Sequence, residues 1–483
     1  MSYIGVKSKM IQGRIGWLLV LIIFVNLACA TSAQSPAPAE ATEVRPRNVI
    51  LFIADGGGIA QLTLGREMAK YLGLRDALYL DAFLSGTVMT HSAKERVTDS
   101  ASSATAYAAG VKTYNSAISV DTLRQPIPTV VDAAERQGMA TGLVATSRIT
   151  HATPASFSSH VPERWMEQDI AAQQIRKGID VLFGGGRRFY LPEAAGGSRE
   201  DGRNLLDEAR ELGYRVVTDY DELPSIDSTP VIALLEADHL PYVIDREPGK
   251  ADLATLTRKA IELLSRHEKG FFLMVEGSRV DHASHENDAA AAAREVIDYD
   301  EAFKVAIDFA RQDGHTVVIA TADHETGGLS LGRAALPAET AEGNPSETTY
   351  WRSLHGRGVY DWRPGVLADV RASAGRIAAR LQDDDADIRS VMAELARVDD
   401  LTDEEIAVIT DARTKRRLVY VVGEIIARRA VIGWTTDGHT AIDVGLYAFG
   451  PGSERLRGVV DNAAIGRFIF DAIGMQPELI TLE

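Results

Sequence analysis

The sequence predicts an α/β protein with a doubly wound, mostly parallel central sheet and helices on both of its faces. Apolar runs rich in β-branched and aromatic residues alternate along the chain with amphipathic segments of helical period. The runs are apolar almost throughout, which is typical of strands that are buried on both faces. The expected strands are residues 48–54, 141–146, 180–183, 271–275, 316–320 and 443–449, and the expected helices include 253–266, 289–311 and 463–473.

One stretch, residues 333–432, interrupts this alternation. It begins with a segment rich in proline, glutamate, threonine and serine (336–349), and it continues as charged, helix-like segments at 387–397 and 403–426. We interpret the stretch as a largely helical, cap-like insertion. The catalytic domain is then formed by residues 48–332 and 433–483.

The N-terminus is typical of a protein that is exported from the cytoplasm. A basic start precedes an apolar run at 17–27, and the small residues at 28–33 offer an A-x-A-like cleavage site, so residues 1–33 are predicted to be a signal peptide. The run is shorter than the roughly 20 residues that cross a bilayer. We therefore expect a periplasmic or extracellular protein with no stable membrane span after cleavage, and an uncleaved anchor is the alternative. Residues 34–47, rich in proline and alanine, are predicted to be a flexible leader.

Composition limits the chemistry that the chain can perform. The formal net charge of −17 argues against nucleic acid as a partner, because binding to the phosphate backbone needs a basic surface. The same charge would repel an anionic substrate unless bound cations reversed the local field. Cys29 is the only cysteine, and signal cleavage would remove it, unless a lipid is attached there. A transition-metal site in the mature protein must therefore use histidine, aspartate and glutamate.

Acidic residues stand at the ends of three predicted strands. Asp55, Glu276 and Asp323 each follow an apolar run, and His324 comes directly after Asp323. Ligands of doubly wound sheets bind outside the carboxyl ends of the strands. One such acid alone could cap the next helix. Three of them with nearby histidines favour a shared metal site, since a buried carboxylate is costly without a partner.

Three further residues have the spacing or context of metal ligands. Asp281 and His285 are four residues apart and would project from one face of a helix. His439 follows a glycine-containing turn before the strand expected at 443–449. The other histidines without a companion ligand are interpreted as structural or surface residues, namely His91, His160, His239, His267, His315 and His355.

The candidate nucleophile is Ser100, in the segment VTDSASSATAYAAG at 97–110. It would lie in the first turn of a helix of small residues, where the helix dipole and free backbone N–H groups favour a bound anion. The alternative is that Thr98, Asp99 or Ser100 simply caps this helix. The sequence has no G-x-S-x-G turn, so the serine would need a metal ion to activate it.

Taken together, these segments resemble the alkaline phosphatases. The resemblance covers residues 48–332 and 433–474, and it is carried by ILFIADGGG, TDSASSATAYAAGVKTYN, TSRITHATPASFSSHVPER, VEGSRVDHASHEND, TADHETGG and WTTDGHT. It implies an enzyme that hydrolyses small-molecule phosphate monoesters and is a homodimer.

The resemblance also assigns roles to residues. Ser100 would become phosphoserine, and Arg164 would bind two phosphate oxygens while Asp99 holds it in place, a role that suits a planar guanidinium. The implied metal sites are a first zinc on Asp281, His285 and His439, a second zinc on Asp55, Asp323 and His324 beside Ser100, and a third ion, magnesium, on Asp55, Thr153 and Glu276.

Two histidines leave the third ion open. His151 and His282 stand where some bacterial relatives have aspartate and lysine, and His151 would lie beside the third site. An imidazole neighbour favours ions softer than magnesium.

Two other functions remain as alternatives. The first is a phosphodiesterase with the same two-metal core, and Arg164 argues against it by occupying the space that a second ester group needs. The second is a non-catalytic phosphate- or metal-binding protein, against which the complete set of ligands and nucleophile argues. A sulfatase is disfavoured, because Ser100 is followed by Ala-Ser-Ser rather than by the C/S-x-P-x-R context.

Overall fold

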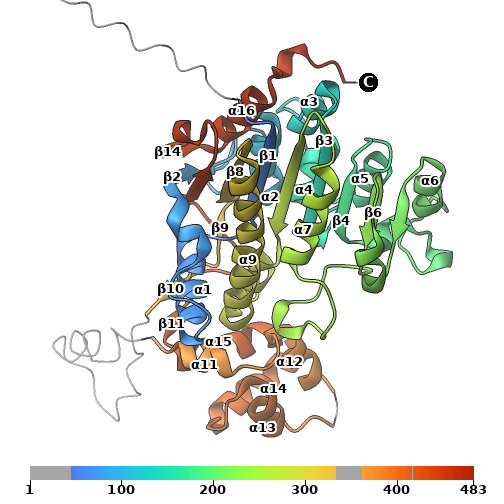
Figure 1. Cartoon of the computed structure of the whole chain (residues 1–483). Helices are drawn as coiled ribbons and strands as arrows, with labels where there is room; N and C mark the ends of the chain where they lie inside the picture. The colour runs from blue at the N-terminus through green and yellow to red at the C-terminus, as the bar shows by residue number, and fades with distance from the viewer. Residues whose placement is uncertain (1–44, 333–361, 384, 416, 483) are drawn as a thin grey trace, which may run out of the picture. The chain divides into compact units, whose positions relative to one another are not determined.

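Figure 1 shows the chain as a computed structural model, which describes residues 45–332 and 362–482 apart from 384 and 416. The predicted signal peptide with Cys29, most of the predicted leader, the segment 336–349 and His355 lie outside the described residues. Among the described helices, none combines the length and the apolar character that a membrane crossing requires.

The centre of the fold is a ten-stranded sheet in the order β14-β2-β13-β8-β1-β7-β3-β4-β6-β5. Within this sheet β13 runs antiparallel to its neighbours β2 and β8, and the other pairs are parallel. The strands are β1 (Asn48–Ala54), β2 (Leu84–Met89), β3 (Ala140–Arg148), β4 (Val181–Gly185), β5 (Arg215–Val217), β6 (Val231–Leu234), β7 (Phe271–Gly277), β8 (Thr316–Ala322), β13 (Val444–Phe449) and β14 (Gly458–Asp461). The predicted fold class is therefore confirmed.

The strands that the sequence did not predict lie toward the edges of the sheet. β5 and β6 have three and four residues, which is too short for an apolar run to stand out. β2 contains serine, glycine and threonine and is mostly half-buried or exposed. β14 is an exposed edge strand that follows β13, so the strand expected at 443–449 is not the last one.

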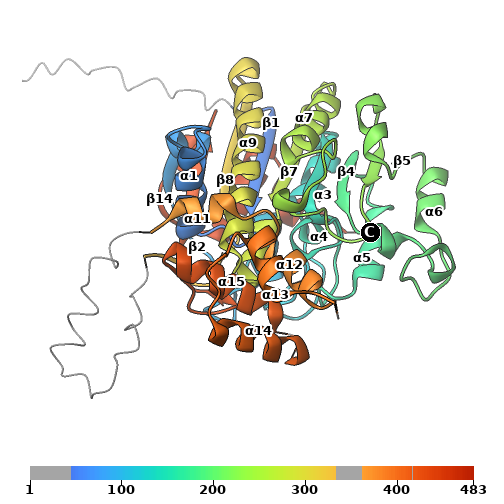
Figure 2. The same cartoon turned by 90° about the horizontal axis from the view of Figure 1, so that it is seen from below.

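Helices cover both faces of the sheet (Figures 1 and 2). One face carries α1 (Ile59–Tyr71), α7 (Leu253–Leu264) and α9 (Ala289–Asp313). The other carries α2 (Ser100–Ala109), α3 (Val130–Gln137), α4 (Ala152–Ser158) and α16 (Asn462–Ile473). α5 (Glu167–Gln174), α6 (Leu205–Glu211) and α8 (Arg279–His285) complete this part of the chain.

Small residues let two of these helix pairs approach closely. A side chain at Gly466 of α16 would place its Cβ 2.6 Å from the backbone oxygen of Ala106 in α2. A Cβ at Gly65 of α1 would lie 2.3 Å from Val296 of α9. The alanine- and serine-rich composition of α2 therefore serves close packing against its neighbours.

The described part of the 333–432 stretch is helical. It forms α11 (Pro364–Asp369), α12 (Ala374–Leu381), α13 (Ile388–Val391), α14 (Asp403–Lys415) and α15 (Leu418–Ala430), with a π-helical turn at Met392–Ala396. The single helix expected at 403–426 is therefore two helices.

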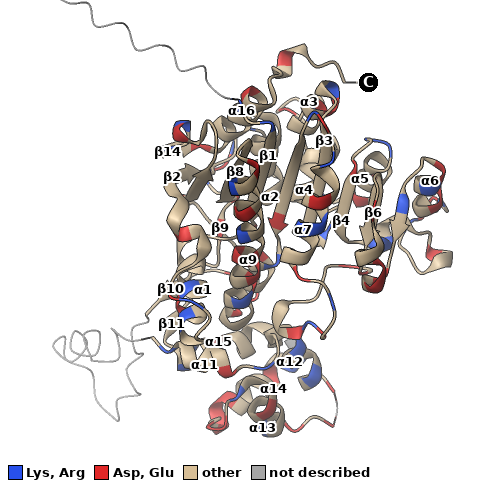
Figure 3. Cartoon of the chain, viewed as in Figure 1, with Lys and Arg blue, Asp and Glu red and all other residues tan. Residues whose placement is uncertain are grey.

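These helices share one buried apolar cluster with parts of the sheet domain. Leu367, Ile377 and Val422 lie in it together with Met68 of α1 and Ala283 of α8. A two-stranded ribbon of β10 (Ser330–Leu331) and β11 (Ile432–Gly433) joins the two boundaries of the stretch. The interpretation of the stretch as a cap remains a prediction. Acidic and basic residues are interspersed over these helices and over the helices of the sheet domain (Figure 3).

Candidate metal centre and nucleophile

The register of the central strands brings the three strand-end carboxylates together. β1 lies between β7 and β8, and Ile53 pairs with Glu276 on one side and with Thr321 on the other. Asp55 and Asp323 therefore leave adjacent strands at the same level. All three carboxylates are fully buried. Their convergence follows directly from the parallel arrangement of three neighbouring strands.

Three histidines and a fourth carboxylate, Asp281, extend this cluster. His324 Nε2 lies 3.2 Å from Asp323 Oδ2 and 3.6 Å from Asp55 Oδ1. On α8, His285 Nε2 lies 3.3 Å from Oδ2 of Asp281, one turn earlier. The third histidine, His439, lies much later in the sequence.

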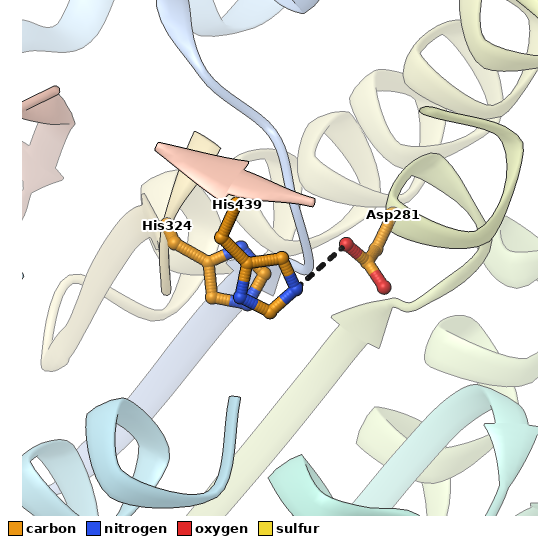
Figure 4. A group of neighbouring side chains, drawn as sticks. All are labelled: Asp281, His324 and His439. Atoms are coloured by element: carbon orange, nitrogen blue, oxygen red, sulfur yellow. Dashed lines mark ion pairs between the residues drawn. The ribbon is translucent and has the colours of Figure 1, made fainter. Parts of the chain in front are cut away.

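A short ribbon places His439. β12 (His439–Thr440) pairs with β9 (Glu325–Thr326), directly after His324. The rings of His324 and His439 stack with centroids 3.5 Å apart, and His439 Nε2 lies 3.7 Å from Asp281 Oδ1 (Figure 4) and 3.1 Å from His285 Nε2.

The possible ligand atoms fall into three groups, in each of which they lie within 4.8 Å of one another. The groups are Asp281 with His324 and His439, Asp55 with Asp323 and His324, and Asp55 with His151 and Glu276.

These groups differ in part from the expected ligand sets. The second is the set expected for the second zinc. In the first, His324 takes the place expected for His285, which lies alongside at hydrogen-bond distance from Asp281 and His439. In the third, His151 joins the two carboxylates that were expected together with Thr153, and the Thr153 hydroxyl is buried close by.

The chemistry of the cluster fits divalent cations. Within the described structure, Asp55 Oδ2, Thr153 Oγ1, Glu276 Oε1 and Asp323 Oδ2 are buried without a hydrogen-bond partner, which is costly for polar atoms. Burial and the nearby charges of Asp323 and Asp281 raise the pKa of Asp55 well above its usual value. Burial raises the pKa of Glu276 to about 8. Bound cations would satisfy these oxygens and let the carboxylates ionise.

Ser100 points at this cluster from the first residue of α2. Its Oγ lies 3.2 Å from His324 Nε2 and 3.5 Å from Asp55 Oδ1, and it is buried. The cap of α2 is Asp99, whose Oδ1 accepts the backbone N–H of Ser102 at 3.0 Å. The alternative in which Ser100 is the cap is therefore wrong, and its hydroxyl is left to face the ligands.

Arg164 is fixed beside Ser100 through the other oxygen of Asp99. Arg164 Nη1 donates to Asp99 Oδ2 at 3.1 Å, and its Nη2 lies 3.1 Å from His151 Nε2. The backbone N–H of Ser116 also donates to Asp99 Oδ2, and the Arg164 backbone N–H donates to the carbonyl of Ser116. Asp99 thus caps the helix of the serine and orients the arginine at once.

Sequence reasoning missed His239. Its ring lies 4.4 Å from that of His282 and 5.8 Å from that of His151, and the rings of His151 and His282 are 5.3 Å apart. His239 thus has histidine neighbours, but it belongs to none of the three ligand groups found among the described residues, so its interpretation as a structural residue stays a prediction. This histidine follows the short strand β6, which gave no sequence signal, and only the strand order brings it near the site. Burial, with the positive charge of Arg148 nearby, lowers the pKa of His239 to about 3, so the ring is neutral.

The fold and this site define an α/β protein with a candidate metal centre beside a buried serine. The family model described as alkaline phosphatase matches residues 46–475. Alkaline phosphatase 3 of Bacillus subtilis is 36% identical over 94% of this chain and 96% of its own length.

Solved structures agree with this match. The cold-active alkaline phosphatase of Shewanella sp. superposes with a TM-score of 0.76 at 33% identity, over 88% of this chain and 99% of the other. A variant of the alkaline phosphatase of the Antarctic bacterium TAB5, with a histidine replaced by aspartate and Mg bound in its M3 site, gives a TM-score of 0.64 at 28% identity, over 89% of this chain and 99% of the other. The chain therefore belongs to the alkaline phosphatase family, whose members are metal-dependent phosphomonoesterases.

Proposed function

We propose that the protein hydrolyses phosphate monoesters through a phosphoserine intermediate on Ser100. The observation that carries the proposal is the position of the serine. Its Oγ faces Asp55 and His324, which each belong to two ligand groups, while the preceding residue, Asp99, holds Arg164. A nucleophile, a cationic phosphate ligand and the metal ligands thus meet at one helix N-terminus.

The proposed ions are two zinc ions and a third divalent ion. The first zinc would be held by Asp281, His285 and His439, with His324 close enough to contribute. The second would be held by Asp55, Asp323 and His324. When bound, the ions lower the pKa of the serine hydroxyl and of water and stabilise the departing alcohol oxygen.

The third ion is proposed to be held by Asp55, Thr153 and Glu276 with His151 beside it. The Mg-bound TAB5 variant supports magnesium as an occupant of such a site in the family. That variant carries aspartate in place of a histidine, whereas this chain brings His151 into the group. We propose magnesium, with a softer ion as the competitor that an imidazole would favour.

The protein's own residues account for binding and for both displacements. Arg164, held by Asp99, offers guanidinium N–H groups to two phosphate oxygens. Ser100 Oγ attacks phosphorus, and the bond from phosphorus to the alcohol oxygen breaks. The alcohol leaves after taking up a proton. Water then attacks the phosphoserine from the side of the departed alcohol, and Ser100 regains its proton as phosphate is released. Two in-line displacements give net retention at phosphorus.

Arg164 favours the monoesterase over a phosphodiesterase. A diester has one fewer free oxygen and one more substituent, and that substituent would meet a guanidinium already fixed by Asp99 and His151. We further propose that the protein is exported and acts as a homodimer. The signal-like N-terminus supports the first proposal and the family resemblance supports the second.

Hydrolysis of a chromogenic phosphate monoester and of the matching diester tests the reaction class. We expect a strong preference for the monoester that is lost on chelation and restored by zinc with magnesium. A preference for the diester would assign the protein to the phosphodiesterases. No turnover of either ester by the metal-loaded protein would leave a phosphate- or metal-binding protein.

Replacing Arg164 tests the mode of phosphate binding. Arg164→Ala should raise the inhibition constant of inorganic phosphate by about 10- to 100-fold, because charge-assisted, paired hydrogen bonds are lost. Arg164→Lys should recover only part of the loss, since an ammonium group cannot form the planar fork. Arg266→Ala, at an exposed arginine of the surface, is the control. Unchanged phosphate inhibition in Arg164→Ala would show that the arginine does not bind phosphate.

A further inference from the structure

An exposed tryptophan stands next to the proposed phosphate-binding arginine. Trp165 is 71% exposed, although an indole is among the side chains that gain most from burial. The guanidinium carbon of Arg164 lies 5.2 Å from the centroid of its ring. The ring is therefore packed against the arginine, while most of its surface is open to solvent.

The arginine holds the indole next to the proposed phosphate-binding group. Arg164 itself is nearly buried, with its guanidinium fixed by Asp99 and His151. A cation packed on an aromatic ring attracts it by roughly 0.5–1 kcal/mol at an exposed site, which favours one orientation of the ring. The open surface of Trp165 is thus an oriented apolar surface rather than a freely moving side chain.

Two further apolar residues are exposed, one in the same turn and one in the segment before Ser100. Met166 follows Trp165 and is 36% exposed, and Val97 is 39% exposed. The segment Asn115–Ser116 links them, because Asn115 Nδ2 donates to the Val97 carbonyl and Ser116 O accepts the Arg164 backbone N–H. Val97 also precedes Thr98, whose carbonyl lies 2.9 Å from His439 Nδ1. The turn beside Arg164 therefore exposes the apolar side chains of Trp165 and Met166 next to the charged Glu163, which pairs with Arg124.

We infer that Trp165 is a specificity-determining residue that stacks on the leaving group, and that the preferred substrates are phosphate monoesters with an aromatic or heteroaromatic ring close to the ester oxygen. This inference rests on the proposed binding of phosphate by Arg164. A group esterified to that phosphate starts beside the residue that follows the arginine. A flat ring can lie against the open surface of the indole, whereas a small alkyl group offers little area for contact.

Rates of ester hydrolysis cannot isolate this contact, because aryl and alkyl alcohols also differ as leaving groups. Phosphonates avoid the difference, since their carbon–phosphorus bond is not cleaved by the proposed displacement. The test is the affinity of the metal-loaded protein for phenylphosphonate and for methylphosphonate, measured by calorimetry. Trp165→Ala removes the ring, Trp165→Phe keeps one, and Leu479→Ala, which is 72% exposed near the C-terminus, is the matched control.

We expect the unsubstituted protein and Leu479→Ala to bind phenylphosphonate about three- to tenfold more tightly than methylphosphonate. Trp165→Ala should reduce this ratio to about one, and Trp165→Phe should keep most of it. An unchanged ratio in Trp165→Ala would overturn the inference. So would an equal loss of affinity for both phosphonates, which would mean that the indole only positions Arg164. If the unsubstituted protein bound neither phosphonate, both the proposed role of Arg164 and this inference would fail. If it bound both phosphonates tightly and equally, only the inference about Trp165 would fail.

Discussion

Ser100→Ala should lower the turnover of a phosphate monoester by at least about a thousandfold while the metal content stays the same. The variant lacks the hydroxyl oxygen that faces both Asp55 and His324 from the N-terminus of α2. Asp99 still caps the helix through Ser102 and still holds Arg164, so neither the fold nor phosphate binding should be lost. Turnover and metal stoichiometry are measured on the same preparation.

Ser103→Ala is the matched control for this variant. Ser103 is a buried serine of the same helix whose hydroxyl donates to the backbone carbonyl of Asp323. Its replacement should cost less than tenfold in turnover. Near-normal turnover in Ser100→Ala would remove Ser100 as the nucleophile. A parallel loss of metal from that variant would mean that the serine is chiefly a ligand.

Removal of the metal ions should make the stability of the folded protein fall as the pH rises from about 4.5 to about 8. In the unfolded chain Glu276 ionises near 4.5, whereas burial raises its pKa in the fold to about 8. Between these values the folded state binds the extra proton, so stability is greatest below the lower value and is lost toward the upper one. This difference in pKa corresponds to roughly 4–5 kcal/mol of stability. Bound cations displace the proton, so the metal-loaded protein should not show this loss.

Thermal unfolding of the metal-free and metal-loaded protein at pH 6 and pH 8 checks this expectation. The stabilisation by metal should be larger at pH 8. Glu276→Gln should reduce the pH dependence of stability in the metal-free protein only. Glu135→Gln is the control, because burial also raises the pKa of Glu135, to about 7, outside the metal cluster. Glu135→Gln should change the pH dependence of stability equally in the metal-free and the metal-loaded protein. If metal raised the unfolding temperature equally at the two pH values, these carboxylates would not be the groups that bind the cations.

The parts of the fold that the sequence predicts are those with strong local signals. β1 and β7 are fully buried on both faces and appear as unbroken apolar runs. The acids that follow such runs could be placed at one edge of the sheet, because parallel strands end together. β5, β6 and β14 lack such a signal, since they are short or exposed. The two-helix form of the segment at 403–426 was missed because apolar and charged residues continue across the break.

The residues of the candidate site also divide into those that spacing in the sequence links and those that only the fold brings together. Asp281 and His285 share a helix turn, and Asp323 and His324 are adjacent, so spacing alone links them. His239 has no such neighbour in the sequence. It reaches His282 only because β6 lies beside β4, and β4 beside β3, in the sheet. Contacts that depend on the order of strands cannot be derived from spacing along the chain.

The ribbon that carries His439 has a consequence for the order in which the protein matures. His439 contacts the carbonyl of Thr98 across 341 residues of sequence, and six of the ten strands of the central sheet lie between them in the sequence. The ligand set is therefore completed only when almost the whole chain has been synthesised and folded. A chain that ends before His439, or that is still unfolded, does not present this set of ligands. Metal binding at this set is therefore expected to follow folding, so the metal content would report the fraction of completely folded molecules.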